Sequence, residues 1–74
     1  MQVNVRLFAT LREGRGKTLT IELKESAVVR DVLAVLAIAE QDAAILLRNR
    51  LDVTLDSELA PQDTISIFPP VGGG

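Results

Sequence analysis

Residues 2–8, QVNVRLF, and residues 18–24, TLTIELK, decide the fold, because polar and apolar side chains alternate in both. A repeat of two residues predicts β-strands with one buried face. Between the two stretches, Gly14 and Gly16 supply the permissive backbone of a connecting loop. The chain is therefore expected to begin with a β-hairpin. Its buried positions would be Val3, Val5 and Leu7 in the first strand and Leu19, Ile21 and Leu23 in the second.

The apolar repeat changes from two residues to that of a helix after residue 28. Apolar side chains then recur at i, i+3, i+4 and i+7, which predicts a helix over about residues 29–40. Val35 and Ile38 lie outside this stripe, and we interpret them as part of a broad buried face. Val28 occupies the expected cap position, where its side chain cannot cap. The stripe consists of Val29, Val32, Leu33 and Leu36.

Short elements are expected in the second half of the chain. They are a strand at 44–48, a turn at Asn49-Arg50, a short element at 51–55, one helical turn at 57–63 stopped by Pro61, and a last strand at 64–68. A hairpin, one helix and returning strands predict an α+β roll, in which a mixed sheet carries one helix across one face. The first and last strands would then lie side by side and parallel, joined through the helix crossover.

The composition excludes several classes of function. The 74 residues include no cysteine and no histidine, which removes disulfides, thiolate zinc sites and the commonest general base. A net charge of −2 and only two aromatic residues argue against nucleic-acid binding. No apolar run approaches the roughly 20 residues of a membrane span, and the opening is unlike a signal peptide. We expect a soluble, cytoplasmic protein with no bound cofactor or metal and no catalytic residues of its own.

The acidic residues are interpreted as turn and surface charges. Residues 38–74 carry six acidic and two basic side chains, and an ordinary solvated surface is preferred over an acidic docking face. No pair of carboxylates has a clear metal-ligand spacing. The residues in question are Asp52, Asp56, Glu58 and Asp63.

Both aromatic residues are expected on the outer face of the sheet. If the valines of the first strand face the core, Phe8 faces away, and Phe68 likewise faces away if Ile65 and Ile67 are buried. Either Leu46 or Leu47 must also point outward, and Leu47 is taken with the two rings. An exposed apolar patch favours an interaction site. We therefore expect Phe8, Leu47 and Phe68 to dock a partner.

The last stretch, FPPVGGG at residues 68–74, is expected to work as an extended tail on a domain of residues 1–68. Prolines cannot continue a sheet ladder and favour an extended path, which at roughly 3.1 Å per residue would reach about 19 Å. Glycines without Cβ can thread a narrow slot. The alternative is an idle, frayed end. The tail consists of Pro69, Pro70, Val71, Gly72, Gly73 and Gly74.

Two stretches resemble one protein family. LFATLREGRG (7–16) resembles the F-A-x-L-R-E opening of the small subunit of molybdopterin synthase, and FPPVGGG resembles its PPV-x-G-G ending. The resemblance covers essentially the whole chain and is that of a MoaD/ThiS-type sulfur carrier with a β-grasp, ubiquitin-like fold. Arg50 and Gln62 stand where the family usually has glycine, and Gly72 replaces its usual serine or alanine.

The resemblance implies a chemical role for Gly74. A ubiquitin-activator-like enzyme would use ATP to adenylate the Gly74 carboxylate, and sulfur transfer would convert it to a thiocarboxylate. The large subunit of molybdopterin synthase would accept the same tail and take the sulfur. Three alternatives remain open: a carrier for thiamin or tRNA thiolation, a protein modifier joined through Gly74 to lysines, and a non-reactive interaction module.

Overall fold

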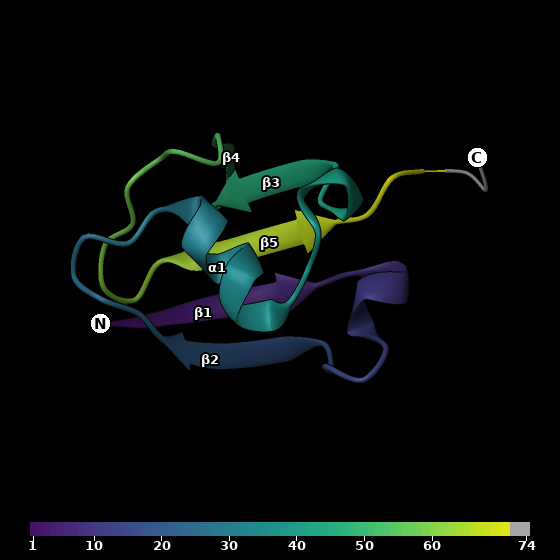
Figure 1. The fold of residues 1–74 in the computed structure, drawn as a ribbon, viewed down its shortest axis with the longest axis horizontal. Helices are drawn as coiled ribbons and strands as arrows, with labels where there is room; N and C mark the ends of the chain where they lie inside the picture. The colour runs from purple at the N-terminus through teal and green to yellow at the C-terminus, as the bar shows by residue number, and fades with distance from the viewer. Residues whose placement is uncertain (72–74) are drawn as a thin grey trace.

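The computed structural model describes residues 1–71 as one mixed sheet with a single α-helix (Figure 1). Two short 3-10 turns, η1 (Ala9–Arg12) and η2 (Glu40–Asp42), lie in the connections. The main elements are β1 (Gln2–Leu7), β2 (Thr18–Glu22), α1 (Val29–Leu36), β3 (Ile45–Arg48), β4 (Leu51–Asp52) and β5 (Thr64–Phe68). None of the helices in this part of the chain is long and apolar enough to cross a membrane.

The sheet confirms the expected topology. Its strand order is β2-β1-β5-β3-β4, with β1 parallel to β5 and every other pair antiparallel. The chain returns from β2 through α1, which lies across one face of the sheet (Figure 1). The first and last strands thus become central neighbours, and residues at their carboxyl ends meet at the same edge of the sheet.

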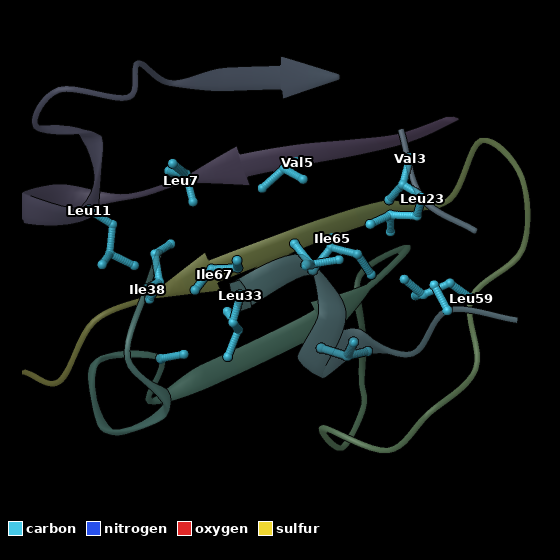
Figure 2. Close-up of a cluster of buried hydrophobic side chains, with 14 residues drawn as sticks. Val3, Val5, Leu7, Leu11, Leu23, Leu33, Ile38, Leu59, Ile65 and Ile67 are labelled. Atoms are coloured by element: carbon cyan, nitrogen blue, oxygen red, sulfur yellow. The ribbon is translucent and has the colours of Figure 1, made fainter. Parts of the chain in front are cut away.

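The core fills the space between α1 and the inner face of the sheet (Figure 2). Alternate residues of β1 and β5 are fully buried there, as the sequence predicts, and they pack against the helical stripe. Fully burying one such side chain stabilises the fold by about 1.5–3 kcal/mol. The central residues are Val3, Val5, Leu7, Val29, Val32, Leu33, Ile65 and Ile67.

The helix is shorter than its sequence pattern predicts. It ends at Leu36 because Ala37 takes the left-handed conformation, with φ 57° and ψ 41°. The turned chain places Ile38 back in the core, where its N–H donates to the Leu33 carbonyl over 2.9 Å. Ile38 is buried as expected, but Val35 is 55% exposed, so the expectation of a broad buried face is wrong for Val35.

Replacing Ala37 with glycine is expected to stabilise the protein by about 1 kcal/mol, because a Cβ is unfavourable in the left-handed region. In a domain of this size, that raises the melting temperature by about 4–8 °C. The matched control is Ala34→Gly, at an exposed position inside α1. It should lower the stability by about 1 kcal/mol. Thermal unfolding of both variants checks the prediction, which fails if the two shifts have the same sign.

Residues 57–63 do not form the expected helical turn. Their backbone groups bond sideways to the segment that enters α1: Val29 N–H donates to Ser57 O over 3.0 Å, and Leu59 N–H donates to Ala27 O over 3.1 Å. Leu59 is buried in the core. Hydrogen bonds to a neighbouring segment and the burial of Leu59 thus replace the hydrogen bonds between nearby residues that a helix would need.

The turn at Asn49-Arg50 forms as predicted and joins β3 to β4. Asn49 has φ 50° and Arg50 has φ 74°, the pair of positive angles that a type I′ hairpin turn requires. The following strand is shorter than the expected 51–55, since only Leu51 and Asp52 pair with β3. The side chain of Arg50 therefore sits on a backbone conformation that favours glycine.

Candidate functional site: an aromatic patch beside the tail

The two phenylalanines stack on the outer face of the sheet, as the alternation of their strands predicts. Phe8 follows β1 directly and Phe68 ends β5. Because these strands are parallel and in register, the rings meet with centroids 4.1 Å apart and planes 9° from parallel. Both rings are half-buried, each shielding one face of the other. Their proposed role in docking stays a prediction.

Strand β3 extends this surface with two aliphatic side chains. Leu46 lies opposite the buried Ile67 and packs against the core, so Leu47 is the leucine that faces outward. Ile45 lies opposite Phe68 and is 44% exposed. We call Phe8, Ile45, Leu47 and Phe68 the aromatic patch. Ile45 is not among the docking residues predicted from the sequence, although strand parity places Ile45 and Leu47 on the same face.

Two guanidinium groups border the aromatic patch. The Arg6 Cζ lies 5.6 Å and the Arg12 Cζ 5.4 Å from the centroid of the Phe8 ring, which is cation–π distance. Arg12 also donates from Nε to the Leu7 carbonyl over 2.8 Å, which fixes its side chain beside the end of β1. Neither contact is among the features predicted from the sequence. The parity of β1 places Arg6 on the outer face, but no local pattern places Arg12 beside the ring.

The tail departs from the end of β5 (Figure 1), directly after Phe68 of the aromatic patch. The Phe68 carbonyl still accepts a hydrogen bond from the Ala44 N–H, over 2.9 Å. Pro69 is half-buried, and Val71 is 91% exposed. The roles expected for Gly72, Gly73 and Gly74 lie outside the described residues. Within residues 1–71, Pro69, Pro70 and Val71 are thus placed at the start of a segment that leaves the fold.

Arg15 braces the part of the fold from which the tail departs. Its guanidinium donates to the carbonyls of Leu36 and Ala37, at the carboxyl end of α1, and to that of Leu11. A cation at this end of a helix also suits the helix dipole. The Arg15 side chain and the two prolines line one groove of about 390 Å³. The base of the tail therefore borders a groove whose other walls come from η1 and from the end of α1.

The acidic residues have structural surroundings. Asp63 is buried, contrary to its interpretation as a surface charge, and its carboxylate accepts hydrogen bonds from Ala60 N–H at 2.8 Å and Asn49 Nδ2 at 3.0 Å. These bonds tie the turn before β5 to the β3–β4 turn. No group of three carboxylates suited to a metal ion occurs within residues 1–71.

Asp56 belongs to an exposed ion-pair network on α1. Arg30 pairs with Asp56 and, over 2.9 Å, with Glu40. The hydrogen bond to Asp56, and to a smaller extent the one to Glu40, raises the pKa of the Arg30 guanidinium above its usual value, because they favour the charged form. Because arginine stays protonated at physiological pH, these exposed ion pairs join α1 to the neighbouring loops and do no acid–base chemistry.

Fold and site together define a ubiquitin-like β-grasp protein with a partly exposed aromatic patch at the base of its C-terminal segment. The chain belongs to the ThiS family, whose model matches residues 5–74. Members of this family are small carrier proteins. Among curated proteins, none matches the chain in sequence.

Solved structures support the same fold. SAMP1 from Haloferax volcanii has 27% identity, a TM-score of 0.83 and full coverage of both chains. A Pyrococcus furiosus protein provisionally named molybdopterin converting factor, subunit 1, has 30% identity and a TM-score of 0.80, covering 96% of this chain and 99% of its own. One chain of a protein–protein complex of subunits 1 and 2 of the molybdopterin-converting factor from Helicobacter pylori has 25% identity, a TM-score of 0.69 and full coverage of both chains. The chain therefore has the fold shared by MoaD/ThiS-type sulfur carriers and ubiquitin-like modifiers.

Proposed function

We propose that this chain is a sulfur carrier for molybdopterin biosynthesis, loaded at the Gly74 carboxylate. The observation that carries the proposal is the stacking of Phe8 on Phe68 directly before Pro69. The stacked rings support an apolar docking surface at the root of the tail, from which a bound partner would also receive the tail. The family match reaches residue 74, and two of the similar structures carry the name of molybdopterin converting factor.

Loading would proceed through a mixed anhydride of the Gly74 carboxylate with AMP. A carboxylate is ionised at neutral pH and is a poor electrophile, because the α-carboxyl pKa is about 3.3–3.7. A ubiquitin-activator-like partner would let a Gly74 carboxylate oxygen attack the α-phosphorus of ATP, which forms the acyl-adenylate and releases pyrophosphate. A sulfide-level sulfur nucleophile would then attack the Gly74 carbonyl carbon. The C–S bond forms as the C–O bond to AMP breaks, AMP leaves with the electron pair, and loss of the proton on sulfur leaves a thiocarboxylate. Everything catalytic belongs to the partner, and this chain supplies the electrophile and the docking surface.

The consuming partner would be the large subunit of molybdopterin synthase. The H. pylori structure is a protein–protein complex of subunits 1 and 2, and one of its chains aligns with the whole of this chain. We infer that an equivalent subunit 2 covers the aromatic patch and takes the tail into its active site. The sulfur would leave Gly74 as the carboxylate is regenerated.

A second candidate function is protein modification. The similarity to SAMP1, which is also described as small archaeal modifier protein 1, favours it. The activation step would be the same, but a lysine amine would displace AMP and form an isopeptide bond.

The intact mass of the chain distinguishes these functions. The chain is incubated with ATP, its cognate activating enzyme and a sulfur donor. We expect a gain that matches one oxygen replaced by sulfur, mapped to Gly74. Conjugates of higher mass in place of this gain would favour the modifier. If the mass of the chain does not change while the same activating enzyme loads a control substrate, both the carrier and the modifier functions are contradicted. That result would favour a non-reactive interaction module.

A further inference from the structure

A polar groove adjoins the aromatic patch on the outer face of the sheet. It encloses about 360 Å³ and crosses β1 and β5 to the β3–β4 turn. Its lining combines two guanidinium groups with hydroxyl and amide groups. The lining residues are Arg6, Asn49, Arg50, Thr64 and Ser66.

Both charged side chains of this groove are cationic. Arg6 lies opposite Ser66 in the parallel pairing of β1 and β5, and Arg50 is exposed in the turn. Neither forms an ion pair within residues 1–71. Asp52, which lies opposite Leu47 in β3, is on the same face and pairs with neither arginine. The groove is thus a local excess of positive charge on a chain with a net charge of −2.

The fold itself does not account for the side chain of Arg50. At φ 74° a residue with a Cβ is disfavoured, and glycine would form the same turn more easily. Backbone strain of this kind is a reason to look for a role of the side chain. Here the strained residue places a guanidinium at the rim of the groove.

The groove is continuous with the proposed docking surface. The Arg6 guanidinium lies 5.6 Å from the centroid of the Phe8 ring, so one side chain belongs to both features. Ser66, on the groove floor, lies opposite Leu47 of the aromatic patch. A protein seated on the patch would therefore extend over the groove.

We propose that Arg6 and Arg50 receive carboxylates of an acidic segment on the protein that covers the aromatic patch. This inference rests on the proposed function and names the chemistry of its partner. The planar guanidinium fork matches a carboxylate with two parallel hydrogen bonds. The neighbouring Thr64 and Ser66 hydroxyls offer further donors in the groove. Apolar burial on the patch would supply affinity, and the arginines would set orientation and association rate.

The test measures binding to the cognate subunit 2 by calorimetry at low and high salt. The variants are Arg6→Gln and Arg50→Gly, with Lys24→Gln, an exposed cation outside the groove, as control. We expect each groove variant to weaken binding about two- to fivefold at low salt, as for an exposed ion pair, and less at high salt. The control should keep wild-type affinity. Arg50→Gly should leave the melting temperature unchanged or higher, because glycine relieves the strained turn.

Unchanged affinity in both groove variants would overturn the proposal, as would a loss that is equal at both salt concentrations. Binding of a single-stranded oligonucleotide to the groove, without any effect of the variants on subunit 2, would also overturn it. The mass assay separates this outcome from failure of the proposed function. If Gly74 is loaded with sulfur but the groove variants bind subunit 2 like the wild type, only the role proposed for the groove is contradicted. If Gly74 is not loaded but the groove variants weaken binding in a salt-dependent way, only the carrier chemistry is contradicted.

Discussion

Deletion of Gly74 is expected to abolish sulfur loading while leaving the fold intact. Activation acts on the terminal carboxylate. The deletion shortens the tail by one residue, so the new terminal carboxylate lies up to about 3 Å nearer to the fold along an extended path. A displacement of about 1 Å in a reacting group can already cost about 100-fold in rate. The core lies between residues 3 and 67, so the melting temperature should match that of the wild type. Intact mass after incubation with the activating enzyme and thermal unfolding measure the two effects.

The control for the deletion is Lys24→Gln, which should load fully. Loading of the shortened chain at the wild-type rate would contradict the assignment of Gly74. A melting temperature lowered by many degrees would show that the tail contributes to the fold and would refute a free tail.

Replacement of both Phe8 and Phe68 by alanine is expected to weaken binding of subunit 2 by about 30-fold or more. Aromatic side chains at the centre of an interface commonly contribute about 2 kcal/mol or more when truncated. The stability should fall by less, about 1–2 kcal/mol, since the rings are only half-buried and their stacking contributes about 0.5–1.5 kcal/mol. Calorimetric titration gives the first quantity and denaturant unfolding the second.

Val35→Ala is the matched control, because Val35 is an exposed apolar side chain on α1, across the core from the aromatic patch. It should bind subunit 2 with wild-type affinity. If the double variant also binds with unchanged affinity while folded, the patch is not the docking surface. Equal losses in the double variant and in Val35→Ala would indicate an effect of exposed apolar area in general.

The outcomes at particular residues show where sequence reasoning holds. The alternation in 2–8 and in 64–68 predicts both central strands and the outward direction of both rings, since strand parity is a local property of the backbone. The turn at Asn49-Arg50 also depends on the preferences of neighbouring residues, and it forms as predicted. The same strand parity, followed along the whole of β3, places Ile45 on the outer face together with Leu47.

The errors occur where distant contacts override a local preference. Ala37 has a high helix propensity but takes the left-handed conformation, because this turn returns Ile38 to the core. Residues 57–63 have a helix-like composition but pair with the segment that enters α1. Burial of Ile38 and Leu59 is worth more than the small propensity differences that a sequence pattern measures.

The sequence by itself determined the order of the strands and helix, the side of each strand that faces the core, and the proline-glycine character of the tail. These follow from dihedral preferences and from a repeat of two or 3.6 residues, which act over a few neighbouring residues. Only the tertiary structure decided which side chains meet across strands: the stacking of Phe8 on Phe68, the cations beside it, and the groove that joins Arg6 to Arg50. The stacked rings and the groove join residues more than 40 positions apart, and they exist only once the parallel register of β1 and β5 has formed.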